Sequence, residues 1–399
     1  MSDLSSRERL ITALARRKPD HVPCCFMIFQ SLQRQCASDF EFFDRQLALG
    51  VDVRVELPDL PFHFTPDVGV RAWKEQRKEE AVLLLHKEYR TPAGTLTTMV
   101  RQTQDWIHGE DVPLFDDYLA PRAVKFLVTE RADVAALRHL LAPPREEEIA
   151  AFRAAAAAYR RYARAKGLLL SGGYRDWRSN ALNVVGNQGG AMVGTDALMW
   201  LCGATAPLFW AFDQPDLLEE LIALIAARDQ RHMELMLDAG AELIVERAWY
   251  AGTEFWSPKL YRQFIAPMLR AKIQIAHQAG AKFGYIITSG VMPILDDLLD
   301  LQIDAILGVD PVQGKGTDLS ALARRVKGRM CIWGGVSAPM SVEHATRAEI
   351  WRAVENAIST CGAQGGFILS PVDNIIDPSR ETWKNVSEFI DAWRQMWNI

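Results

Sequence analysis

Carboxylate side chains follow several apolar, strand-like runs of this sequence. Glu246 closes the apolar run at residues 243–245, Asp310 follows the run ending at Val309, and Asp373 lies just beyond the last run. A carboxylate at the end of a strand, inside a cleft, is typical of a general acid or a metal ligand. Asp310 and Asp373 also suit hydrogen-bonded turns, so a purely structural role stays open for both.

Other side chains with useful chemistry follow the same kind of run. The candidates for binding a substrate are Tyr174, Arg175, Asp176, Trp249, Tyr250, Thr288, Ser289 and Asp310. Arg175 and Asp176 could equally form a solvated surface pair, which usually contributes little. The aromatic residues would wall a pocket and exclude water from it.

Short motifs do not name a reaction. The eight histidines include no pair spaced i, i+4, and the six cysteines include no C-x-x-C pair. The chain also lacks Gly-x-Ser-x-Gly, a phosphate-binding loop and H-E-x-x-H. Neither a nucleophile nor a zinc site of these common kinds is predicted.

Eight strand-like runs alternate with helical patterns along the chain. They cover residues 22–28, 51–56, 168–171, 242–246, 282–288, 304–309, 330–333 and 366–369. Several are continuously apolar, as expected for parallel strands covered on both faces. This alternation predicts an α/β fold, a (β/α)8 TIM barrel, whose active site lies at the carboxyl ends of the strands. A doubly wound open sheet is the alternative, but no Gly-x-Gly-x-x-Gly follows an early strand.

The first third of the chain departs from that alternation. Runs at residues 82–90 and 95–100 flank the turn sequence Thr91-Pro92-Ala93-Gly94, which predicts a β-hairpin. We expect one domain over residues 1–399, with this hairpin inside an insertion at about residues 60–145.

Composition narrows the class of protein. Of 399 residues 49% are hydrophobic, and 45 basic against 50 acidic residues give a net charge of −5. Nucleic acid is therefore not expected as the main partner. No apolar run of 18 residues or secretory signal is present, which predicts a cytoplasmic protein without a membrane span.

Several segments, in order along the chain, resemble the uroporphyrinogen decarboxylase superfamily, and in particular its corrinoid-dependent methyltransferase-like branch. They are Arg7-Glu8-Arg9-Leu10, Pro19-Asp20-His21-Val22-Pro23, Trp256-Ser257-Pro258, Trp333-Gly334-Gly335-Val336 and Gly365-Gly366-Phe367-Ile368-Leu369-Ser370-Pro371. The resemblance implies a (β/α)8 barrel. It also implies one of two activities, namely decarboxylation without a cofactor or transfer of a methyl group.

The first hypothesis is a methyltransferase or demethylase. It would move a methyl group from a small O- or N-methylated compound to a corrinoid (cobalamin) carried by a partner protein. Glu246 is the first choice for the acid that assists the leaving group, and Asp373 is the second. The corrinoid protein would dock at the mouth of the barrel, and a homodimer is a further assembly that the sequence leaves open.

The sequence departs from both family activities. Where the methyltransferases have His-x-Cys-Gly for zinc, residues 287–290 read Ile-Thr-Ser-Gly, so zinc is in doubt. If a metal is bound, Glu246 and Asp373 are its expected ligands. The second hypothesis is a cofactor-independent lyase (a decarboxylase of a smaller acid), with Arg175, Arg178 and Arg247 as carboxylate anchors. The third hypothesis is a non-catalytic barrel that binds a small molecule.

Overall fold

The computed structural model describes residues 4–174 and 191–398. Its main sheet consists of seven parallel strands in the order β1-β6-β7-β8-β9-β10-β11, which forms a TIM-barrel-like half-barrel in a mixed α/β fold. The strands are β1 (Arg54–Glu56), β6 (Leu169–Gly173), β7 (Leu243–Arg247), β8 (Lys282–Ile286), β9 (Ala305–Val309), β10 (Cys331–Ser337) and β11 (Phe367–Val372).

The first predicted strand, residues 22–28, does not form a regular ladder. It makes two isolated parallel bridges, from Cys24 to Leu369 and from Ile28 to Asn374. Two of its backbone N–H groups donate to side chains instead of carbonyl oxygens: Cys24 to Asp52 (3.1 Å) and Met27 to Ser370 (2.9 Å). Side-chain acceptors therefore interrupt the ladder, and the sheet has seven strands where the sequence predicts eight.

Helices separate the strands of this sheet. The longer ones are α1 (Ser6–Leu14), α3 (Asp39–Ala48), α4 (Arg131–Leu140), α5 (Glu146–Lys166), α8 (Pro215–Asp238), α10 (Ala266–Gln278), α13 (Arg347–Cys361) and α14 (Arg380–Met396). The shorter ones are α2 (Gln30–Gln33), α6 (Asp196–Cys202), α7 (Ala206–Asp213), α9 (Pro258–Leu260), α11 (Leu295–Asp300) and α12 (Leu319–Val326). Capping boxes begin α1 and α13, formed by Ser5 with Glu8 and by Thr346 with Glu349.

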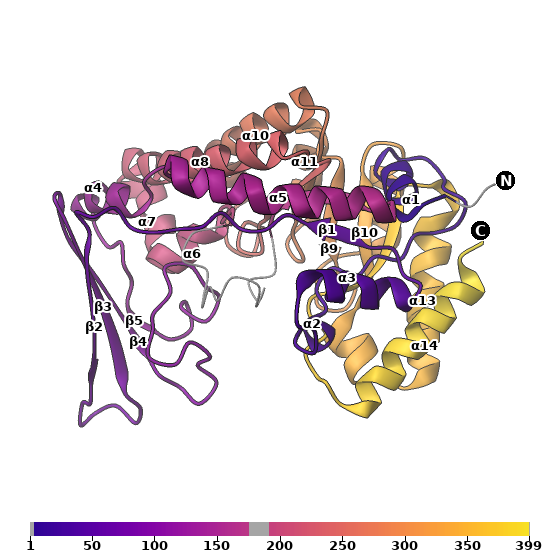
Figure 1. Cartoon of the computed structure of the whole chain (residues 1–399), viewed down its shortest axis with the longest axis horizontal. Helices are drawn as coiled ribbons and strands as arrows, with labels where there is room; N and C mark the ends of the chain where they lie inside the picture. Colours follow the sequence, from indigo (N-terminus) through magenta and orange to yellow (C-terminus); the bar gives the residue numbers. More distant parts are fainter. Residues whose placement is uncertain (1–3, 175–190, 399) are drawn as a thin grey trace.

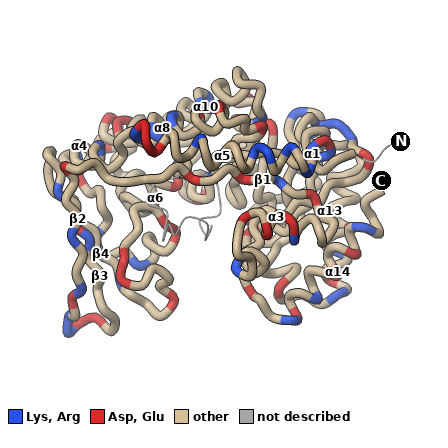
Figure 2. The backbone as a smooth tube through the Cα atoms, in the orientation of Figure 1, with Lys and Arg blue, Asp and Glu red and all other residues tan. Residues whose placement is uncertain are grey.

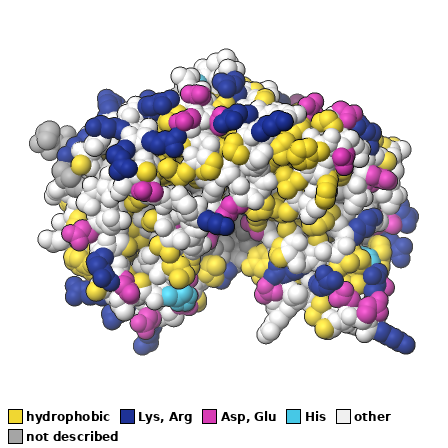
Figure 3. All heavy atoms as spheres, turned by 180° about the vertical axis from the view of Figure 1, so that it is seen from behind, with side chains coloured by type: hydrophobic (Ala, Val, Ile, Leu, Met, Phe, Trp, Pro, Cys, Tyr) yellow, Lys and Arg dark blue, Asp and Glu magenta, His cyan; other side chains and the backbone are white. Residues whose placement is uncertain are grey.

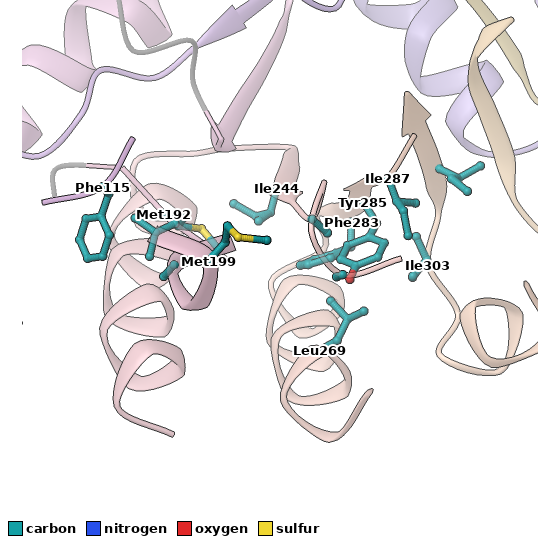
Figure 4. Close-up of a cluster of buried hydrophobic side chains, with 14 of the residues drawn as sticks. Phe115, Met192, Met199, Ile244, Leu269, Phe283, Tyr285, Ile287 and Ile303 are labelled. Carbon is teal, nitrogen blue, oxygen red and sulfur yellow. The ribbon is translucent and has the colours of Figure 1, made fainter. Parts of the chain in front are cut away.

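Side chains of β7 and β8 alternate between two buried faces. Leu243 and Val245 share the inner cluster with Trp333. Ile244 belongs to the outer cluster, and Figure 4 shows it on the side of the sheet where Leu269 of α10 lies. Successive strand residues point to opposite faces, so the direction of each side chain after Val245 is fixed by this alternation.

A separate antiparallel sheet is built from the first third of the chain. Its strands are β2 (Gly69–Glu75), β3 (Leu84–Thr91), β4 (Gly94–Arg101) and β5 (Ala123–Lys125). β3 and β4 pair across Pro92 and Ala93, with Thr91 opposite Gly94. Figure 1 shows this sheet at one end of the molecule, far from α13 and α14 at the other end.

The two ends of the molecule enclose a hollow. Figure 3 shows it between the two lower parts of the surface, with acidic and basic side chains inside it. The antiparallel sheet follows the carboxyl end of β1, and α2 follows the segment at residues 23–28. The hollow therefore lies at the carboxyl ends of the parallel strands, which we call the mouth. None of the described helices is long and apolar enough to cross a membrane.

Candidate active site

Arg247 is the last residue of β7 and lies at the mouth. By alternation it shares the inner face with Val245, and its side chain is almost fully buried. Its Nε donates to Asp196 at 2.7 Å, and one terminal nitrogen donates to both oxygens of Asp117 at 3.0 and 2.9 Å. Burial alone would lower the pKa of Arg247, but the charges of these two carboxylates raise it above its usual value. The guanidinium of Arg247 is therefore held in place at the mouth, and the two aspartates neutralise its charge.

Three aromatic rings surround this guanidinium. Its central carbon lies 4.4 Å from the ring centre of Trp249, 4.5 Å from that of Trp200 and 5.5 Å from that of Tyr174. Tyr174 and Trp249 also contact each other edge to face, with 5.5 Å between their centres. Cation–π contacts of this kind strengthen when water is excluded. The structure therefore brings two predicted site residues, Tyr174 and Trp249, into one wall of the mouth.

Asp196 and Asp117 hold the wall in place. Asp196, at the start of α6, is fully buried and accepts the backbone N–H groups of Trp249 (3.2 Å) and Tyr250 (3.0 Å). Burial raises the pKa of Asp196, while the charge of Arg247 opposes that rise. Asp117 accepts the Tyr250 hydroxyl at 3.0 Å. Sequence reasoning missed both aspartates, since neither follows a strand of the parallel sheet and no motif marks them.

Asp310 follows β9, and its two carboxylate oxygens have different surroundings. One oxygen accepts the backbone N–H groups of Val312 (2.7 Å) and Gln313 (2.8 Å), which is the turn that the sequence left open. The other oxygen is buried and has no hydrogen-bond partner among the described residues. A buried, unsatisfied acceptor is costly, so it marks a place where a ligand or water can donate a hydrogen bond.

Asp373 follows β11 and is half-buried. Its φ of 70° is in the left-handed region, which few non-glycine residues occupy. Burial raises the pKa of Asp373, and the negative charges of Asp310 and Asp117 raise it further. Asp373 therefore holds a proton more readily than a solvated aspartate, as a general acid requires.

Thr288 and Ser289, which follow β8, point to different surroundings. The Trp249 indole N–H donates to the Thr288 hydroxyl at 3.1 Å, so Thr288 supports the aromatic wall. The Ser289 hydroxyl donates to Glu254 in an exposed contact. The structure thus connects Thr288 to the mouth and gives Ser289 a partner outside it.

Glu246 lies on the opposite face of β7 from Arg247. It is fully buried and accepts a hydrogen bond from Lys272 of α10 at 2.8 Å, while Lys272 also lies 3.2 Å from Asp229 of α8. The second carboxylate oxygen of Glu246, Oε1, is buried and has no hydrogen-bond partner among the described residues. Strand alternation turns Glu246 toward the helices, on the face of β7 opposite to Arg247.

Arg175 and Asp176 lie outside the described residues, as does Arg178. The remaining predicted site residues, all of which are described, fall into two groups. Tyr174, Trp249, Tyr250, Thr288, Asp310 and Asp373 belong to the mouth or its supports. Glu246 and Ser289 have partners elsewhere.

The donor set does not fit zinc. Ile287, at the position where the resemblance implies histidine, is buried in the outer apolar cluster, as Figure 4 shows. The hydroxyls of Thr288 and Ser289 are poor ligands for zinc compared with a thiolate. In residues 4–174 and 191–398, no three His, Cys, Asp or Glu side chains are grouped so that they could hold a metal.

Comparison with known proteins adds four findings. A sequence profile described as uroporphyrinogen decarboxylase matches residues 189–396, more than half of the chain. A methyltransferase from Methanosarcina mazei shares the fold, with a TM-score of 0.59, 17% sequence identity, and coverage of 98% of this chain and 99% of that chain. A B12-independent methionine synthase from Shewanella sp. W3-18-1 gives a TM-score of only 0.37, with 10% identity over 61% of this chain and 65% of that chain. No curated sequence matches significantly.

Proposed function

Because this chain belongs to the uroporphyrinogen decarboxylase family, we propose that it is an enzyme of the methyltransferase type. It takes a methyl group from a small O- or N-methylated compound and passes it to a corrinoid carried by a partner protein. The observation that carries the proposal is the charge of the mouth. Its buried arginine is neutralised by Asp196 and Asp117, and two further carboxylates, Asp310 and Asp373, face the same space.

The charge argues against uroporphyrinogen as the substrate. A molecule with eight carboxylates needs a pocket with unpaired cationic donors. The guanidinium of Arg247 instead donates to two aspartates. Among the described residues of the mouth, carboxylates outnumber arginines. Carboxylates beside aromatic rings suit a neutral ether or a methylated ammonium, because both avoid repulsion and both pack against rings.

The chain's own residues supply the groups that demethylation of an ether needs. The methyl carbon leaves without its bonding electrons, and the electron pair of the C–O bond stays on the oxygen. That oxygen must gain a proton, and we assign its transfer to Asp373, which follows β11 at the mouth and whose pKa is raised by burial. A reduced corrinoid, when bound, would supply the electron pair that forms the new bond to the methyl carbon.

For an N-methylated ammonium no proton is needed at the leaving nitrogen. The carboxylates of Asp310 and Asp373 would then bind the cation, and Trp249 and Tyr174 would offer ring faces to its methyl groups. The corrinoid partner would approach through the hollow at the mouth (Figure 3).

The test is a methyl-transfer assay with free cob(I)alamin. Purified protein is incubated with methyl ethers, methylated phenols and methylated amines, and formation of methylcobalamin is followed by its absorbance. Transfer by the wild type that Asp373→Asn reduces for ethers supports the proposal. Release of carbon dioxide from small acids without methyl transfer would favour the lyase. Ligand binding without either reaction would favour a non-catalytic barrel.

A further inference from the structure

A second concave site lies at the other end of the parallel sheet, where β8, β9 and β10 begin. It is a cavity of ≈ 550 Å³. The lining side chains that matter here are Arg16, His277, Lys282, Gln302, Asp304 and Arg329. Since the mouth lies at the carboxyl ends of the strands, this cavity is remote from the candidate active site.

One buried carboxylate sits among the basic groups. Asp304 lies 2.9 Å from the Lys282 ammonium, 3.3 Å from the Arg16 guanidinium and 2.7 Å from the His277 ring, and its side chain is only 4% exposed. Arg16 and Lys282 each keep about 30% of their side chains exposed. Both cations can therefore bind Asp304 and still reach a ligand in the cavity.

Positive charge exceeds negative charge in this region. Arg329 also lines the cavity, and its acidic partner Asp300 is 3.7 Å away and largely exposed. An adjoining cavity of ≈ 350 Å³ shares Gly328 with the first and adds Arg324 and Lys327. The two cavities together are lined by five lysines or arginines and one carboxylate, Asp304. Figure 2 shows Lys and Arg gathered around α1, whose end borders this site.

The backbone gives an independent observation. Three described non-glycine residues have a positive φ, and two of them, Arg16 (60°) and Gln302 (62°), line this cavity. Each follows the last turn of a short helix, where glycine is the usual residue because it has no Cβ. The third is Asp373 at the mouth. Strained residues are more frequent at functional sites, so two of the three at one cavity support a ligand there, although each also ends a helix.

We propose that this cavity binds a small molecule through a phosphate group. Arg16 and Lys282, with Arg329 at the rim, form a set of donors that suits the oxygens of a phosphate. The side chain at position 16 adds a donor that glycine would lack, which offsets the strain of the left-handed backbone. The site is independent of the proposed methyl transfer, and its occupancy would bias the stability of α1 and the amino ends of β8 and β9.

Thermal unfolding of the full chain tests the proposal. Inorganic phosphate, pyrophosphate and citrate are titrated at constant ionic strength, with sodium chloride as the balancing salt. A ligand that binds only the folded state raises Tm in a concentration-dependent way. We expect phosphate or pyrophosphate to raise the Tm of the wild type by a few degrees, and Arg16→Gly to lose that rise.

Arg16→Gly is informative because glycine relieves the positive φ, so a folded variant is expected. Lys282→Gln provides a second variant in the cavity, and Arg347→Ala removes an exposed arginine of α13 as a control for net charge. An equal rise in the wild type and both cavity variants would show general screening and overturn the proposal. No rise with either phosphate probe would overturn it too, and a rise with citrate alone would replace phosphate by a carboxylate ligand.

Discussion

Glu246 and Arg247 are neighbours on β7, both are buried, and both are paired with opposite charges, yet they belong to different regions. Glu246 pairs with Lys272 of α10 in the helix layer, Lys272 also contacts Asp229 of α8, and both side chains are almost completely buried. The partner Asp117 of Arg247 keeps 42% of its side chain exposed at the mouth. A buried charge pair is therefore no sign of a reaction centre by itself. What distinguishes the mouth is this exposure of a charged partner to solvent.

The two regions are nevertheless connected. Asp229 accepts the backbone N–H groups of Val193 (3.0 Å) and Gly194 (2.7 Å), which precede α6. α6 begins with Asp196, the carboxylate that fixes Arg247. Glu246, Lys272 and Asp229, which we call the outer network, thus position the segment that carries Asp196, a partner of Arg247. Substitutions in the outer network should mainly lower the free energy of unfolding. Substitutions at the mouth should mainly lower the rate of turnover.

The largest effect is expected for Asp373→Asn. Removing a general acid costs about 10²–10⁴-fold in rate, so turnover of a methyl ether should fall by about that factor. Asparagine keeps the shape and tolerates a positive φ, so the free energy of unfolding should not fall. Steady-state methyl transfer and urea unfolding measure the two quantities. A variant with wild-type kcat would remove Asp373 from the reaction.

The raised pKa of Asp373 predicts how kcat and the free energy of unfolding depend on pH. Turnover of an ether requires protonated Asp373, so kcat should fall as pH rises through its pKa, which lies above the ordinary value of 3.8. The folded state also binds this proton more tightly than the unfolded state. Stability should therefore decrease as pH rises from 3.8 to the raised pKa, and Asp373→Asn should lack that decrease. Unfolding curves of the two proteins across this range provide the comparison.

The outer network predicts the largest loss of stability. Lys272→Met leaves Glu246 and Asp229 buried without this cation, and breaking a buried pair in this way costs about 3–5 kcal/mol. Urea unfolding measures the loss. Lys259→Met, at an exposed lysine of α9, is the matched control and should change the free energy of unfolding by less than about 0.5 kcal/mol. Equal effects in the two variants would contradict the role assigned to Lys272.

A milder change in the outer network separates it from the mouth. Glu246→Gln keeps the size of the side chain but removes a charge-assisted hydrogen bond, worth about 1.5–3 kcal/mol. The free energy of unfolding should fall by that amount, whereas the folded variant should keep its kcat. A kcat reduced about a hundredfold or more with unchanged stability would instead restore Glu246 as the acid.

The sequence predicted the seven strands of the parallel sheet because several of them, such as β9, are short and continuously apolar runs. It also predicted that polar residues after those strands would gather at one end, and Tyr174 and Trp249 do contact each other there. It could not assign Glu246 to a face, because a run that is buried on both sides has no alternation to show which way a residue points. Asp117 and Asp196 reach the mouth from outside the parallel sheet, through contacts between residues distant in sequence.

The smallest effect is expected at the support of the aromatic wall. Thr288→Val keeps the shape but removes the acceptor of the Trp249 indole N–H, a hydrogen bond worth about 0.5–1.5 kcal/mol. Trp249 would lose its fixed orientation beside Arg247, so KM should rise by a few-fold to about tenfold while kcat changes less. Ser289→Ala is the comparison, since its hydroxyl donates to Glu254 in an exposed contact. If Ser289→Ala raised KM as much as Thr288→Val, the mouth would extend to Ser289 and its boundary would have to be redrawn.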